Sequence, residues 1–178
     1  MYKKNYHLWL GAFFIFLFDL LTKTWALMKL PLESEVITRS WFSLNRVYNE
    51  TTIFLNYDAS SINMSPIEFR IFYSVIASIL LIGTIWVVNQ PSMNDGSKES
   101  EWAKTGLFII IGGMFGNLFD RIFRQGVVDF IKLDFMEDSM PVINVADVMI
   151  YVGELCLLYV WLLIITKLLL KLKFKIII

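Results

Sequence analysis

Cysteine and histidine are nearly absent from this chain of 178 residues, which contains one of each, Cys156 and His7. A single cysteine excludes an intramolecular disulfide and a zinc site built from several cysteines. A single histidine argues against a histidine-based metal site and against a Ser-His-Asp triad. Any catalysis by this chain must therefore rest on carboxylates, lysine, serine or tyrosine.

A net charge is absent as well, because 16 basic residues balance 16 acidic ones. No global electric field therefore indicates nucleic acid as a partner. Apolar residues dominate instead: 57% of the chain is hydrophobic, and the mean hydropathy is +0.61. This apolar content is too high for an ordinary soluble domain of this size and indicates a membrane protein.

Four stretches are long and apolar enough to cross a bilayer core, which takes about 20 residues per helix. They cover residues 8–30, 69–88, 103–123 and 145–170. Ser65-Pro66-Ile67-Glu68 is typical of a capping box before the second span, and Asn144 can cap the fourth, with Asp147 three residues on. The sequence therefore predicts an all-α integral membrane protein, with residues 1–178 forming a single membrane domain.

Lysines predict how these spans are oriented. Four spans put both termini on one side, together with lysines at residues 3–4, 98–104 and 167–175. By the positive-inside tendency this side is cytoplasmic, so residues 31–65 and 124–144 face outward. The first outward segment mixes β-branched and aromatic residues with polar ones, which predicts a small β-rich extracytoplasmic segment after the first helix.

Ionisable residues inside membrane spans are costly and usually face the protein interior. Asp19 and Lys23 lie four residues apart on one helix face, and we expect them to form an ion pair that holds helices together. Asn117, Asp120 and Arg121 share a face of the third span. A polar network there can hold helices together and also orient a neighbouring site.

Glu154 is a further acid within a span. It follows Asp147 by seven residues, so it lies on the same helix face about 10 Å deeper. It could pair with Lys23 at a similar depth or line a pocket, and the sequence leaves both interpretations open.

Two acids of the outer region stand among apolar residues, Asp129 in "VVDFI" and Asp147 in "NVADV". If two carboxylates meet at one site, one stays ionised while the other holds a proton. The ionised group can take a proton from water, and the protonated one can donate to a carbonyl or a leaving amine. Alternatively, Asp147 is an acid favoured at a helix start and Asp129 an exposed loop residue.

The ordered motifs "GNLFDR", "GVVDFI" and "NVAD" resemble the signature of bacterial lipoprotein signal peptidase, also called signal peptidase II. The resemblance implies that Asp129 and Asp147 form the catalytic pair. Asp19 and Lys23 match the family's D-x-x-x-K element, and with Asp120 they are expected to be structural. The polar residues that match positions expected to orient the pair or bind substrate are Asn49, Asn117, Arg121 and Asn144.

The implied activity is that of a membrane aspartyl endopeptidase, which removes signal peptides from prolipoproteins by cutting before a diacylglyceryl-modified Cys. The implied partners are these modified prolipoproteins and membrane lipids, with no nucleic acid. The resemblance implies a monomer in the bacterial plasma (inner) membrane with both termini cytoplasmic. It implies no metal and no organic cofactor.

The chain departs from the family pattern after Asn49. The family usually continues with x-Gly-Ala-Ala-Phe, whereas this chain reads "NETTIF" and has Thr51 in place of the glycine. The added bulk and lost backbone freedom could reshape the substrate cradle. Two other function classes stay open: a catalytically silent prolipoprotein-binding paralogue, and a small ion or proton carrier with a relay of Asp19, Lys23, Asp120 and Glu154.

Overall fold

The computed structural model describes residues 5–32, 35–38, 42–49, 65–124, 126–133 and 142–176. This part of the chain contains four long helices, α1 (Tyr6–Lys29), α2 (Pro66–Val88), α3 (Lys98–Phe123) and α4 (Val145–Ile176), and a short 3-10 helix, η2 (Pro91–Asn94). Each long helix is long and apolar enough to cross a membrane. The predicted membrane protein with four helical spans is therefore confirmed.

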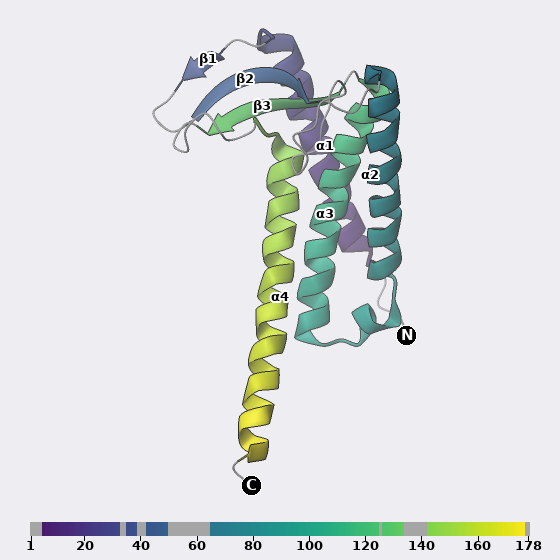
Figure 1. Ribbon diagram of the computed structural model, residues 1–178, viewed down its shortest axis with the longest axis vertical. Helices are drawn as coiled ribbons and strands as arrows, with labels where there is room; N and C mark the ends of the chain where they lie inside the picture. Colours follow the sequence, from purple (N-terminus) through teal and green to yellow (C-terminus); the bar gives the residue numbers. More distant parts are fainter. Residues whose placement is uncertain are drawn as a thin grey trace.

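Helix α3 is the centre of the helical bundle, because it packs against α1, α2 and α4. Figure 1 shows a small sheet at one end of the bundle and both chain termini at the opposite end. Gly106 and Gly153 let α3 and α4 approach closely. A Cβ atom on Gly153 would lie 2.6 Å from the backbone oxygen of Gly106, which is too close for any other residue.

The helix ends follow local capping signals. The Ser65 side chain accepts from the backbone N–H of Glu68, and the Glu68 carboxylate accepts from the backbone N–H of Ser65, so the predicted capping box is confirmed. Helix α3 begins five residues earlier than its apolar run, because Ser97 caps it by accepting from the backbone N–H of Ser100. Helix α4 continues past residue 170 through a leucine- and lysine-rich segment without glycine or proline.

Three antiparallel strands form the sheet in the order β1 (Glu35–Thr38), β2 (Phe42–Asn49) and β3 (Val127–Leu133). Strands β1 and β2 confirm the predicted strands after the first helix. Strand β3 lies in the second outer segment, where no strand was predicted from the sequence. Its first four residues are all buried, so it lacks the apolar–polar alternation by which a half-exposed strand is recognised. The pairing of β2 with β3 joins the two outer segments into one unit.

Candidate active site

Strand β3 and the first turn of α4 bring two buried carboxylates to one cavity. Asp129 on β3 is 1% exposed, and Asp147 in the first turn of α4 is 3% exposed. Both side chains line a cavity of about 340 Å³ that also contacts α2 and α3. Asp129 is therefore a buried strand residue and not an exposed loop acid.

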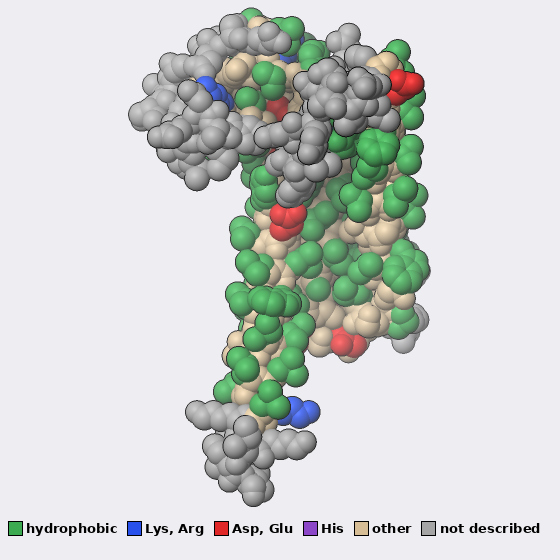
Figure 2. Space-filling model, viewed as in Figure 1, with side chains coloured by type: hydrophobic (Ala, Val, Ile, Leu, Met, Phe, Trp, Pro, Cys, Tyr) green, Lys and Arg blue, Asp and Glu red, His purple; other side chains and the backbone are tan. Residues whose placement is uncertain are grey.

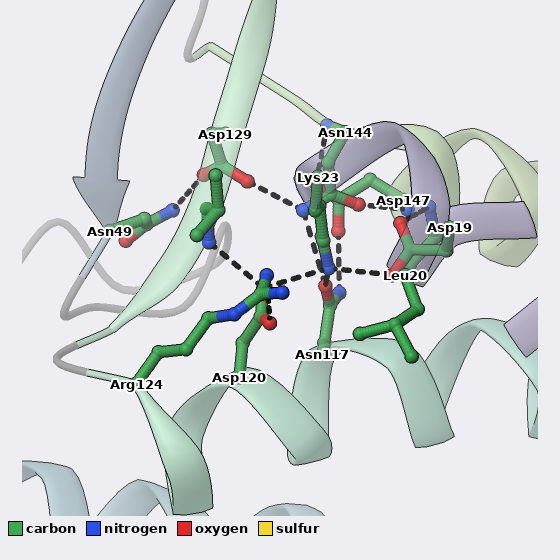
Figure 3. Close-up of polar contacts among 12 residues, drawn as sticks. Asp19, Leu20, Lys23, Asn49, Asn117, Asp120, Arg124, Asp129, Asn144 and Asp147 are labelled. Carbon is green, nitrogen blue, oxygen red and sulfur yellow. Dashed lines mark hydrogen bonds and ion pairs between the residues drawn. The ribbon is translucent and has the colours of Figure 1, made fainter. Parts of the chain in front are cut away.

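Asn144 is hydrogen-bonded to both acids (Figure 3). Its Nδ2 donates to Asp129 Oδ1 at 2.5 Å, and its backbone N–H donates to Asp147 Oδ2 at 3.1 Å. Its Oδ1 accepts from the backbone N–H of Asp147 at 2.9 Å, which is the predicted cap of α4. One fully buried side chain therefore fixes the position of one acid relative to the other.

Two more amides complete the hydrogen bonding of the acids. Asn117 Nδ2 donates to Asp147 Oδ1 at 2.8 Å, and Asn49 Nδ2 donates to Asp129 Oδ2 at 2.9 Å. Each of the four carboxylate oxygens thus accepts an N–H group. Asn49 reaches Asp129 because it ends β2, where Val47 pairs with Asp129 across the sheet.

The position of Asp129 favours its protonated form. Burial raises the pKa of this carboxyl from its ordinary value near 3.8 to about 7, and the nearby charge of Asp147 adds to the rise. The hydrogen bonds from Asn49 and Asn144 oppose this shift. A carboxyl that still holds a proton near neutral pH can act as a proton donor.

Arg121 lines the same cavity as the two acids and is 8% exposed. Its guanidinium lies over the ring of Tyr73, with Cζ 5.5 Å from the ring centroid. Its positive charge interacts with the carboxylates of Asp129 and Asp147. A pair of acids that shares one proton has a net charge of −1, which Arg121 can balance.

An ionic cluster lies beside the acids, and Lys23, Asp19 and Asp120 at its centre are fully buried. Lys23 Nζ is 2.8 Å from Asp19 Oδ2 and 3.1 Å from Asp120 Oδ2, and it donates to Asn117 Oδ1 at 2.8 Å. Arg124 pairs with the other oxygen of Asp120 at 2.7 Å. Opposite charges are paired throughout this cluster, which offsets part of the cost of burying them.

The same cluster holds the backbone next to each of the two acids. Asp19 Oδ1 accepts from the backbone N–H of Ala146 at 2.8 Å, and Asp120 Oδ2 accepts from the backbone N–H of Val128 at 3.0 Å. Ala146 directly precedes Asp147, and Val128 directly precedes Asp129. Helices α1 and α3 therefore fix both backbone positions from which the acids project.

A family model described as signal peptidase (SPase) II matches residues 11–163. The chain belongs to this family. The match includes every residue of the cavity and of the ionic cluster, and it confirms the family resemblance seen in the sequence.

Individual relatives agree with this assignment, and a solved structure has the same fold. A lipoprotein signal peptidase of Cellvibrio japonicus is 34% identical over 162 residues, covering 89% of this chain and 89% of that protein. One of Wigglesworthia glossinidia brevipalpis is 32% identical over 145 residues, covering 82% and 87%. A solved bacterial membrane enzyme structure, determined by the in meso method, has the same fold with a TM-score of 0.72, at 20% identity over 91% of this chain and 92% of the other.

The sequence of this signal peptidase II family member did not predict the roles of two residues near the acids. Arg124 follows Asp120 by four residues, a spacing typical of a helical ion pair, and could have been found. Tyr73, under Arg121, has no sequence signal, because its position depends on how α2 packs against α3. Of the two interpretations of Glu154, pairing with Lys23 is wrong, since Lys23 is enclosed by Asp19, Asp120 and Asn117; Glu154 lines the cavity instead.

Thr51, Thr52 and Ile53 of "NETTIF" lie outside the described residues. Within the described residues, no group of three or more Asp, Glu, His or Cys side chains could hold a metal ion.

Proposed function

We propose that this chain is an aspartyl endopeptidase that removes signal peptides from prolipoproteins, with Asp129 and Asp147 as its catalytic residues. The observation that carries this proposal is that Asn144 bridges two buried carboxylates which line one cavity. The family and the lipoprotein signal peptidases that resemble this chain support the substrate class. In the proposed reaction the cut lies before a Cys that carries a diacylglyceryl group.

Asp147 is the general base in the proposed mechanism, and Asp129 is the general acid. Asp147 lies in the first turn of α4, where the helix dipole favours a negative charge, and it accepts N–H groups from Asn117 and Asn144. Asp129 holds the shared proton, because burial and the charge of Asp147 raise its pKa.

In the first step, Asp147 takes a proton from water while the water oxygen bonds to the scissile carbonyl carbon. Asp129 gives its proton to the carbonyl oxygen, which produces a tetrahedral diol. In the second step, Asp147 returns its proton to the leaving nitrogen, and the carbon–nitrogen bond breaks. Asp129 recovers a proton from a diol hydroxyl, so both acids end in their starting states.

The cavity continues from the acids along the faces of three helices. Its apolar walls suit the membrane-spanning part of a signal peptide, and they include Ile76, Ala77, Leu80, Ile110 and Ile150. Figure 2 shows hydrophobic side chains over most of this face of the bundle. The diacylglyceryl chains would stay in lipid while the peptide reaches the acids, since apolar chains gain nothing by leaving the bilayer.

The proposed orientation puts the sheet and the acids at the outer surface of the bacterial plasma membrane. Lys167 and Lys171 lie near the opposite end of α4, and this charge placement favours cytoplasmic termini. In the proposed site, four residues orient the acids or the substrate, namely Asn49, Asn117, Arg121 and Asn144. Asp19, Lys23 and Asp120 hold the surrounding backbone.

A gel-shift cleavage assay with a diacylglyceryl-modified prolipoprotein tests the proposal. We expect Asp129→Asn and Asp147→Asn each to lower the cleavage rate by about 10²–10⁴-fold, because general acid–base catalysis contributes that much. Asp95→Asn is the matched control, since Asp95 lies in the link between α2 and α3, away from the cavity. Full cleavage by both folded site variants would refute the roles of the acids, and no cleavage by the folded intact chain would refute the activity.

A further inference from the structure

Glu154 adds an ionisable side chain, itself exposed, to the residues that line the cavity. It follows Asp147 by seven residues on α4, so it lies about 10 Å from Asp147 along the same helix face. Tyr151 lies between them on this face, and all three side chains line the cavity. The other residues that line the cavity include apolar side chains of α2, α3 and α4 and the hydroxyl-bearing Thr84.

Within the described part of the chain, the Glu154 carboxylate has no hydrogen bond and no ion pair. The buried cations are engaged elsewhere: Lys23 contacts Asp19 and Asp120, and Arg121 lies over Tyr73. The Thr84 hydroxyl donates to the backbone oxygen of Leu80 at 2.8 Å. Among the described residues, no donor is therefore hydrogen-bonded to the Glu154 carboxylate, although the Tyr151 hydroxyl lines the same cavity.

An ionisable side chain at membrane depth is costly without a partner, and such residues usually contact a substrate or a transported ion. We propose that Glu154 is a specificity-determining residue that binds a basic or hydrogen-bond-donating side chain of the signal peptide. This inference rests on the proposed function, because it takes the signal peptide as the occupant of the cavity.

The chemistry of a carboxylate favours the peptide over the lipid as its partner. An ionised carboxylate only accepts hydrogen bonds. A diacylglyceryl group offers ester oxygens, which also only accept, whereas peptide side chains such as lysine, serine and threonine donate. Glu154 therefore discriminates between signal peptide sequences and not between acyl chains.

The separation from Asp147 defines which part of the peptide meets Glu154. A distance of about 10 Å corresponds to roughly three residues of extended peptide at about 3.3 Å each. It corresponds to about seven residues of helical peptide at about 1.5 Å each. The contacting side chain thus lies about three to seven residues before the scissile bond.

For each position of this window, the test compares three versions of one diacylglyceryl-modified prolipoprotein. The three versions have Leu, Lys or Glu at that position. The measured quantity is kcat/KM for the intact enzyme, Glu154→Gln, Glu154→Lys and Glu99→Gln. Glu99 is the matched control for loss of a carboxylate, because it pairs with Lys167 outside the cavity. Thermal unfolding of each purified variant checks that it is folded.

At one position, we expect the intact enzyme to prefer the Lys substrate over the Glu substrate by about tenfold, which corresponds to a modest charge interaction. Glu154→Gln should reduce this preference to near unity, and Glu154→Lys should reverse it, while Glu99→Gln keeps it. Equal preferences in all four enzymes would overturn the role of Glu154. Cleavage of the Leu substrate by the intact enzyme tests the proposed function separately in the same assay.

Discussion

Asn144 and Asp147 exchange two hydrogen bonds at the start of α4. The backbone N–H of Asn144 donates to Asp147 Oδ2 at 3.1 Å, and the backbone N–H of Asp147 donates to Asn144 Oδ1 at 2.9 Å. This arrangement has the form of a capping box. Because Asn144 Nδ2 also donates to Asp129, the motif that starts the helix also positions the two acids relative to each other.

Substitutions of Asn144 should separate its capping role from its role in the site. Asn144→Asp keeps an oxygen that can accept from the backbone N–H of Asp147, but it turns a carboxylate oxygen toward Asp129. We expect the unfolding temperature to fall slightly and kcat/KM to fall by about 10²-fold or more, as for loss of a general acid–base group. Asn144→Ala should also lose about 1 kcal/mol of unfolding free energy.

Ser97→Ala is the control for these substitutions. It removes the side-chain cap of α3, which lies outside the cavity, and should cost a similar unfolding free energy with no loss of kcat/KM. Equal losses of activity in Ser97→Ala and Asn144→Asp would mean that helix stability alone controls activity.

The raised pKa of Asp129 predicts how stability varies with pH. Between about pH 4 and pH 7, folded Asp129 keeps a proton that the unfolded chain releases. The free energy of unfolding therefore decreases as pH rises through this interval. Asp129→Asn removes this pH-dependent loss of stability. The unfolding temperature of the variant minus that of the intact protein should therefore be higher at pH 8 than at pH 4.

Asp95 provides a control of opposite sign. Hydrogen bonds, first from the Ser100 side chain and then from the Ser97 backbone, lower the pKa of the Asp95 carboxyl. Its contribution to stability is present above its unfolded pKa and is lost as pH falls. The unfolding temperature of Asp95→Asn should therefore fall furthest below that of the intact protein at neutral pH. The same trend in both variants would argue against a raised pKa at Asp129.

The spans were predictable from the sequence, because each needs only a long apolar run. The Ser65 cap was predictable as well, because it depends on two residues three positions apart. Strand β3 was not, since its buried run "VVDF" lacks alternation and its pairing with β2 joins segments about 80 residues apart in the chain. The ordered motifs identified the polar residues near the cavity. Their mutual contacts depend on that long-range pairing and on the packing of α1 against α3, which no local pattern encodes.

Gly116 shows why close packing of α1 and α3 matters for the site. A Cβ atom there would overlap the carboxylate of Asp19 and lie 3.4 Å from the Cβ atom of Ala146. We expect Gly116→Ala to lower the unfolding free energy by about 1–3 kcal/mol through overpacking. Activity should fall with it, because Asp19 would shift away from the backbone N–H of Ala146.

Gly83→Ala on α2 is the matched control for Gly116→Ala. A Cβ atom on Gly83 would have no neighbour within 4 Å. Alanine should leave the unfolding temperature unchanged or raise it, since it favours a helix over glycine by about 1 kcal/mol. Thermal unfolding of both variants measures the difference. Equal destabilisation by the two substitutions would rule out the clash at Gly116 as the cause of the lower stability of Gly116→Ala.

Lys23 is both the central cation of the buried cluster and the donor to Asn117. Lys23→Met leaves Asp19 without a cationic partner, whereas Asp120 keeps Arg124. Breaking a buried ion pair typically costs about 3–5 kcal/mol, so the unfolding temperature should fall sharply. Adding Asp19→Asn removes the unpaired charge and keeps an acceptor oxygen for the adjacent backbone, so the double variant should recover part of this stability.

Activity should not recover with stability in that double variant. Lys23 Nζ donates to Asn117 Oδ1 at 2.8 Å, and Asn117 Nδ2 donates to Asp147. Without the lysine, the Asn117 amide loses one of the donors that fix its orientation, and Asp147 is held less firmly. Measurements of kcat/KM and unfolding temperature on both variants decide the point. If activity returns in proportion to stability, Lys23 acts only by stabilising the fold, and if it stays low, Lys23 also orients Asp147 through Asn117.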